Sequence, residues 1–128
     1  MIYLDSSALV KLVVREPESV ALLRYLGQHP DRASCGLART EVVRAVGPQG
    51  GRALARARKI LNRIDLVALD DELLDDAGLL GTSALRSLDA IHLAAARSLG
   101  RDLIAVVTYD SRMAAAATAL GLDVASPS

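Results

Sequence analysis

The fold is decided near the start of the chain, in the stretch Ile2-Tyr3-Leu4-Asp5-Ser6-Ser7-Ala8-Leu9. Its beginning predicts a short apolar strand, Ile2–Asp5, that ends in a carboxylate. The residues that follow, Ser7–Arg15, predict an apolar helix that ends before Pro17. The stretch therefore opens an alternating pattern of strands and helices.

The rest of the chain continues this alternation. Because alternating strands and helices imply a parallel sheet covered on both faces, we expect the α/β class. The continuous apolar run of the fourth strand, Leu103–Thr108, favours burial on both sides of the sheet. The other expected strands are Arg32–Gly36, Leu66–Leu69 and Asp123–Ala125, and the other expected helices are Glu18–Leu26, Leu37–Val46, Gly51–Ile64, Asp71–Leu80, Ser87–Leu99 and Arg112–Leu120.

Length and composition predict one domain, residues 1–128, since 128 residues of which 52% are hydrophobic can bury a single core. No apolar run approaches the roughly 20 residues that span a bilayer. The start lacks the basic, apolar and small-residue pattern of a signal peptide. Cys35 is alone, so neither an internal disulfide nor a cysteine-based zinc site is expected. These features predict a cytoplasmic protein with no membrane partner.

The charge gives no global sign of nucleic-acid binding, because the formal net charge is zero. Of the 15 cationic residues only Lys11 and Lys59 are lysines. A guanidinium group binds phosphate through two N–H groups at once, so phosphate recognition by individual arginines is possible. A GC-rich genome also enriches a protein in arginine and is the alternative explanation. Phe and Trp are absent and Tyr numbers three, so aromatic stacking of single-stranded bases is nearly excluded.

Four carboxylates are expected at one edge of the sheet, where the functional groups of parallel sheets gather. Asp5 ends the first strand, and Asp110 lies just past the fourth. Glu41 and Asp89 lie on helices whose preceding loops reach the same edge. Each also fits a structural role: Asp5 and Asp110 as helix N-caps, Asp89 as a first-turn acid and Glu41 as a solvated helix residue.

The four acids together predict a metal site. Clustered carboxylates repel one another, and a hard divalent cation such as Mg²⁺ or Mn²⁺ relieves that repulsion with carboxylate and water oxygens. Such an ion activates water and holds a phosphoryl oxygen, which indicates phosphodiester hydrolysis. No nucleophile–histidine pair is evident: His29 lies in a turn, and His92 lies one helical turn after Asp89. We expect His92 on the helix surface or in the core, with a supporting role at the pocket as the alternative.

The pattern as a whole resembles the PIN-domain family, and more closely the VapC toxins within it. The resemblance implies a three-layer α/β/α sandwich whose parallel sheet has the strand order 3-2-1-4-5, and a Mg²⁺- or Mn²⁺-dependent endoribonuclease. Tyr109 is the main departure, at a position where the family varies. The resemblance rests on Ile2–Leu9, Glu16–Ser19, Thr40–Ala45, Leu88–Ala94, Val107–Asp110 and Leu120–Leu122.

The same resemblance implies roles for individual residues. Asp5 and Asp89 would be the principal metal ligands, Glu41 would bind the metal through water or orient the attacking water, and Asp110 would complete the pocket. Members of the family commonly form homodimers and are held inactive by a VapB antitoxin whose tail fills a groove beside the pocket. The supporting hydroxyls would be Ser6 and Thr108.

Two surfaces beside the pocket are expected. Arg44 lies one turn after Glu41 and is the first candidate for an RNA contact, with a salt bridge to a nearby carboxylate as an equal alternative. The resemblance implies a groove for an antitoxin segment, and we place it on the early helices, which carry more apolar residues than one buried face needs; an amphipathic helix would fit there. The residues expected to line it are Leu9, Leu12, Val13, Val20 and Leu23.

Three other interpretations stay open. A phosphoryl-receiver signalling domain also binds Mg²⁺, but it needs a lysine near a late strand and an aspartate after the middle strand, where Leu69-Asp70-Asp71 is a poor context. A nucleotide-binding module is disfavoured because Gly47–Gly51 matches neither glycine-rich phosphate loop. A catalytically silent PIN-like interaction domain is disfavoured by the complete acidic set, and the sequence does not exclude it.

Overall fold

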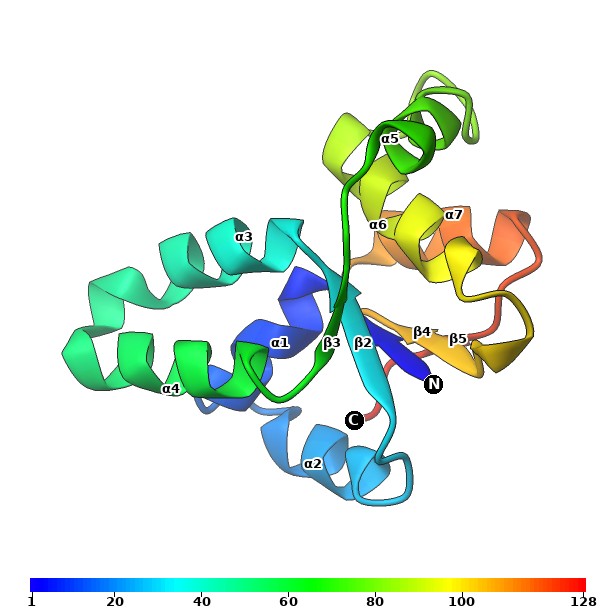
Figure 1. Ribbon diagram of the computed structural model, residues 1–128. Coiled ribbons are helices and arrows are strands. Elements are labelled where there is room, and N and C mark those ends of the chain that lie inside the picture. The colour runs from blue at the N-terminus through cyan, green and yellow to red at the C-terminus, as the bar shows by residue number, and fades with distance from the viewer.

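The strand that opens the chain lies at the centre of the sheet. In the computed structural model, which describes residues 1–128, β1 (Ile2–Leu4) pairs in parallel with β2 (Arg32–Cys35) and β4 (Ala105–Val107) (Figure 1). β3 (Asp65–Val67) and β5 (Val124–Ala125) form the two edges, also in parallel. The resulting order, β3-β2-β1-β4-β5, confirms the predicted topology.

Two groups of helices cover the two faces of the sheet. Side chains alternate along β1, so Ile2 and Leu4 face one group and Tyr3 faces the other. This arrangement confirms the three-layer α/β/α sandwich. The first group is α1 (Ser6–Val13), α2 (Ser19–Leu26), α3 (Leu37–Val46) and α4 (Gly51–Leu61), and the second is α5 (Asp71–Gly78), α6 (Ser87–Ser98) and α7 (Ser111–Ala119), with short 3₁₀ turns at Gly47–Gln49 and Gly100–Asp102.

Two predictions about apolar residues are wrong. The fourth strand is buried on both sides of the sheet as predicted, but its predicted start is wrong: it begins at Ala105, and Ile104 is 52% exposed after the 3₁₀ turn. Leu9 and Val13 belong to the core, 0% and 4% exposed, although Val13 also borders a surface cavity beside Arg52 and Arg56 of α4. The reason is that α1 follows the central strand directly, so its inner face must cover the sheet. On α2, by contrast, Val20 and Leu23 are exposed as expected, whereas Leu12 on α1 is only partly so.

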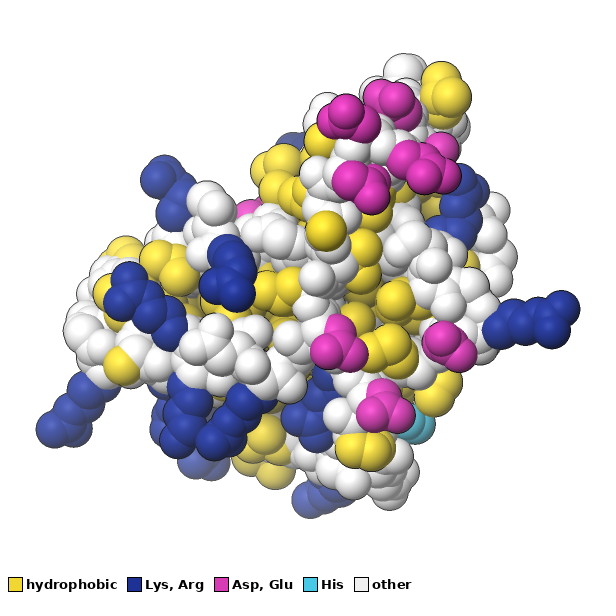
Figure 2. All heavy atoms as spheres, viewed as in Figure 1, with side chains coloured by type: hydrophobic (Ala, Val, Ile, Leu, Met, Phe, Trp, Pro, Cys, Tyr) yellow, Lys and Arg dark blue, Asp and Glu magenta, His cyan; other side chains and the backbone are white.

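The zero net charge hides a separation of charge along the chain. Figure 2 shows acidic side chains gathered over α5 and basic side chains over the region of α3 and α4. Because the electrostatic field is strongest close to the charges that produce it, the acidic surface of α5 attracts cations and the basic surface of α3 and α4 attracts anions. The exposed acids of α5 are Asp71, Glu72, Asp75 and Asp76, and the exposed cations of α4 are Arg52, Arg56, Arg58 and Lys59.

No helix combines the length and the apolar character needed to cross a bilayer.

Candidate active site

Asp5 lies directly after the central strand and is buried, with 3% of its surface exposed. As the N-cap of α1, its Oδ1 accepts hydrogen bonds from the Ala8 backbone N–H at 3.0 Å and the Ser7 hydroxyl at 2.6 Å. Its Oδ2 accepts a short hydrogen bond from the Thr108 hydroxyl. Burial raises the pKa of Asp5, and the bonds from Ser7 and Thr108 only partly oppose this rise. An ionised Asp5 is therefore costly until a cation approaches it.

The ends of β1 and β4 are tied together by hydroxyl groups. Thr108 Oγ1, besides donating to Asp5, accepts the backbone N–H of Asp110 at 3.1 Å. The Ser7 hydroxyl accepts the backbone N–H of Tyr109 at 3.0 Å. Two segments about a hundred residues apart thus meet at the carboxyl ends of neighbouring strands, as the sequence predicts.

Glu41, on the second turn of α3, is fixed by two side chains. Its Oε1 accepts a hydrogen bond from the Ser6 hydroxyl at 2.7 Å and lies 2.6 Å from Nε2 of His92. Burial raises the pKa of Glu41, but the bonds from His92 and Ser6 outweigh it, and the pKa falls below its usual value. Glu41 is therefore no freely solvated helix residue, and its Oε2 stays available.

His92 is the site residue that the sequence underrates. The sequence placed it on the helix surface or in the core, and it lies in the core, 3% exposed. Its ring also contacts Glu41. Its Nδ1 faces the Tyr3 hydroxyl at 2.8 Å and Cys35 Sγ at 3.7 Å, while Nε2 faces Glu41. Burial lowers the pKa of His92, but hydrogen bonds with Cys35 and Glu41 outweigh it and raise the pKa to about 10. The only sequence signal was its position one helical turn after Asp89.

Asp89 and Asp110 complete the set of acids. Asp89 lies in the first turn of α6 and accepts no hydrogen bond, and burial followed by the charge of Asp110 raises its pKa. The negative charge of Asp5 raises it further. Asp110 caps α7, with Oδ1 accepting the backbone N–H groups of Arg112 at 2.8 Å and Met113 at 3.3 Å. The structural roles of Asp5 and Asp110 as caps thus coexist with positions near enough to Asp89 for their charges to raise its pKa.

The pocket does not form a closed cage of protein ligands. No three His, Cys, Asp or Glu side chains are placed to hold a metal ion by themselves. Mg²⁺ does not need such a cage, because it usually binds one or two carboxylates and keeps several waters. The donor chemistry fits this mode: Asp89 has unused oxygens, and its pKa is raised by burial and then by repulsion from Asp110 and Asp5. A divalent cation would remove that repulsion.

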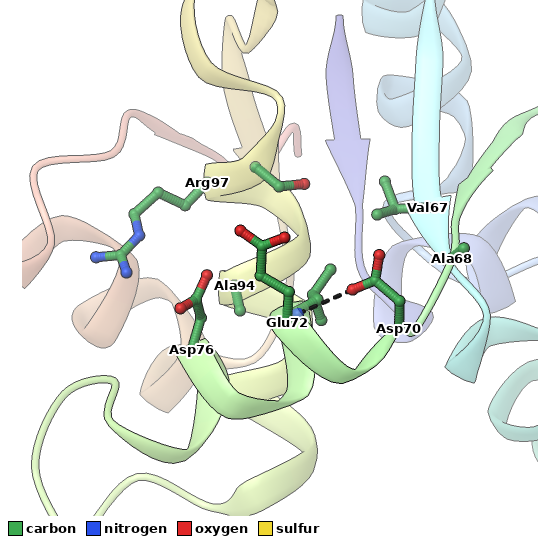
Figure 3. Close-up of a pocket in the computed structure, with 9 residues that line it drawn as sticks. Val67, Ala68, Asp70, Glu72, Asp76, Ala94 and Arg97 are labelled. Carbon is green, nitrogen blue, oxygen red and sulfur yellow. Dashed lines mark hydrogen bonds between the residues drawn. The ribbon is translucent and has the colours of Figure 1, made fainter.

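A second acidic cluster lies away from this pocket. Figure 3 shows Asp70, Glu72 and Asp76 around a cavity of about 440 Å³ between β3, α5 and α6, with Arg97 on the far side. Asp70 caps α5 by accepting the backbone N–H of Leu73 at 2.9 Å. Because Asp70 follows an edge strand, it does not lie where a receiver domain needs its aspartate, after the middle strand. The receiver interpretation is thereby further weakened.

Comparison with known proteins agrees with this geometry. Residues 2–119 match the model of the PIN domain family. The chain is 54% identical to Ribonuclease VapC46 of Mycobacterium tuberculosis over 127 residues, which are 99% of this chain and 98% of that protein.

Solved structures of low sequence identity share the fold. The crystal structure of M. tuberculosis VapC20, described as a toxin that cleaves the sarcin–ricin loop, has a TM-score of 0.75 at 18% identity and covers 91% of this chain and 95% of its own. A toxin–antitoxin complex from Klebsiella pneumoniae has a TM-score of 0.75 at 19% identity and covers 100% and 98%. Fold, family match and close relative agree, and the chain belongs to the PIN-domain family and, within it, to the VapC ribonucleases.

Proposed function

We propose that the chain is a Mg²⁺- or Mn²⁺-dependent endoribonuclease that acts as the toxin of a type II toxin–antitoxin pair. The observation that carries the proposal is that Thr108 joins Asp5 to the backbone of Asp110 where the paired strands β1 and β4 end, with Asp89 near enough for both acids to raise its pKa. The two nucleophile types beside His92 are both engaged elsewhere: the Ser6 hydroxyl, 3.4 Å from Nε2, donates to Glu41, and the Cys35 thiol beside Nδ1 is buried, which speaks against covalent catalysis. Family membership supports the reaction class.

Each acid has a distinct task in this proposal. Asp5 and Asp89 would hold a divalent metal ion, which would supply an activated water and a positive charge beside the scissile phosphate. Glu41, held by Ser6 and His92 through Oε1, uses its free Oε2 to orient the attacking water and take up its proton. The free Oδ2 of Asp110 completes the shell of acceptors, and Thr108 keeps Asp5 in place.

The proposal is tested by incubating the purified chain with cellular RNA and either Mg²⁺ or Mn²⁺. We expect cleavage that stops with EDTA and returns when Mn²⁺ is added in excess. Undiminished cleavage in EDTA would contradict the metal mechanism. A catalytically silent interaction domain would leave RNA intact with either metal.

Arg44 is proposed as one RNA contact at the edge of the pocket. Its side chain is exposed and forms no ion pair, so the alternative salt bridge is absent. We expect Arg44→Ala to weaken RNA binding by about threefold, and the melting temperature to stay unchanged, since one exposed phosphate contact is lost. Fluorescence anisotropy with labelled RNA measures the affinity, and unchanged binding would remove Arg44 from the RNA path.

A VapB-type antitoxin and a second copy of the chain are the proposed partners. Val20 and Leu23, 49% and 58% exposed on α2, offer apolar surface to an amphipathic helix. We propose that the antitoxin also places a cation, most simply an arginine, among the four acids and so displaces the metal. Co-purification with the neighbouring gene product, followed by an RNA cleavage assay and a mass measurement, checks these proposals. A complex that cuts RNA at the full rate would contradict inhibition.

A further inference from the structure

A cavity of about 490 Å³ opens beside Asp89, between the start of α6 and the first half of α7. Asp89 itself forms part of its wall, so the cavity borders one of the four acids. The α7 side is lined by Ala115 and Ala116, whose short side chains leave the space open. The acidic pocket therefore has a neighbouring space large enough for part of a nucleotide.

Two arginines line this cavity. Arg86 precedes α6 and lies three residues before Asp89, and its charge lowers the pKa of that acid. Arg112 lies two residues after Asp110, on the first turn of α7. Both side chains are exposed and neither forms an ion pair. Two unpaired guanidinium groups thus stand beside carboxylates that would otherwise repel a polyanion.

A strand of RNA needs positive charge at this position. When one phosphate reaches the acids, the next phosphate along the strand lies nearby and is repelled by the same carboxylates. A guanidinium binds phosphate with two parallel N–H groups, and this geometry fixes both the position and the direction of the strand. We propose that Arg86 and Arg112 hold the phosphate next to the scissile one, with its nucleotide lying against Ala115 and Ala116.

This inference rests on the proposed ribonuclease function and adds a substrate contact to it. RNA is the occupant that the site favours, because the cavity shares Asp89 with the proposed reacting centre and is lined by two arginines without ion pairs. An acidic segment of a protein partner would also meet the two arginines, but it would place its carboxylates beside Asp89 and Asp110. If the two arginines bound an acidic protein segment and not RNA, the inference would be wrong.

The test measures how tightly a short fluorescein-labelled single-stranded RNA of mixed sequence binds in EDTA, where cleavage and metal contacts are absent. We expect Arg86→Ala and Arg112→Ala each to raise the dissociation constant by about fivefold to tenfold. The salt dependence of log affinity should fall by about 0.7 for each lost phosphate contact. Arg86→Lys and Arg112→Lys should bind RNA more tightly than the alanine variants and more weakly than the wild type, because lysine keeps the positive charge but cannot form the two parallel hydrogen bonds of a guanidinium group.

The matched control is Arg101→Ala. Arg101 is an exposed arginine in the 3₁₀ turn Gly100–Asp102, which precedes β4 at the amino ends of the strands, away from the acids. A thermal melt of every variant checks folding, and cleavage in Mn²⁺ should show a raised KM with little change in kcat. A double variant that binds RNA within about twofold of the Arg101→Ala control would overturn the inference, since two charged hydrogen-bond contacts weaken binding by more than that. So would a double variant that loses only antitoxin binding.

The two levels of proposal fail separately in these experiments. A wild-type chain that binds RNA and cuts none with Mn²⁺ would refute the ribonuclease function. A wild-type chain that cuts RNA, together with arginine variants that bind and cut equally well, would refute only the phosphate contact.

Discussion

Asn in place of Asp5 or Asp89 is expected to lower the rate of RNA cleavage by roughly a hundredfold to a thousandfold, because metal catalysis supplies several kcal/mol of the barrier reduction. An amide is a weak ligand for a hard cation and cannot balance its charge. The measurement is RNA cleavage in Mg²⁺ for the two variants and the wild type. Cleavage by either variant at the wild-type rate would mean that the residue is not a ligand.

The same substitutions are expected to leave the fold intact and to stabilise it in the absence of metal. In Asp5→Asn the remaining Oδ1 still caps α1, and the new amide donates to Thr108, whose hydroxyl can turn to accept.

The pH dependence follows from the direction of the shift. Burial raises the folded-state pKa of Asp5, so its favourable contribution is complete below the unfolded-state pKa and is lost as the pH rises through the folded-state value. The gain in melting temperature should therefore appear at neutral pH and vanish in acid. Mg²⁺ should stabilise the wild type and not the variants. Asp76→Asn, on exposed α5, is the matched control and should change neither activity nor Mg²⁺ response.

His92→Gln is expected to weaken Mn²⁺ binding or kcat by about tenfold to a hundredfold, the usual cost of removing a partner that orients a metal-site residue. His92 holds Glu41 through Nε2 and is itself held through Nδ1 by the Tyr3 hydroxyl. Glutamine restores one hydrogen bond at most. We expect KM for RNA to stay nearly constant while kcat falls, because His92 is buried beneath the pocket and does not face the substrate.

Two further variants separate positioning from packing. Tyr3→Phe keeps the ring in the core and removes only the outer hydrogen bond, so its effect on kcat should be smaller. His92→Ala also leaves buried polar groups unpaired and should lower the free energy of unfolding by about 1–3 kcal/mol. If His92→Gln melted at a lower temperature but kept the wild-type kcat and Mn²⁺ affinity, His92 would be structural only.

The sequence predicted those parts of the site that depend on strand order and on one element at a time. Asp5 and Asp110 follow strands that are neighbours in a parallel sheet, so their proximity follows from the topology. The contact of Tyr3, His92 and Glu41 was not predictable in this way, because it joins a strand and two helices from opposite faces of the sheet. The prediction for Leu9 and Val13 was wrong for a related reason. The sequence shows that a helix has many apolar residues, but it does not show which face of the helix packs against the sheet.

The bond between Thr108 and Asp5 spans 103 positions of the chain, and this has a consequence for synthesis. β1 is made first, yet its neighbour β4 and the acid that follows β4 are made near the end. At roughly 5–20 residues per second, about 5–20 s separate the appearance of Asp5 from that of Thr108. A ribosome-bound chain that has not yet reached β4 holds Asp5 without Thr108 and without Asp110. Such a nascent chain should be unable to cut RNA.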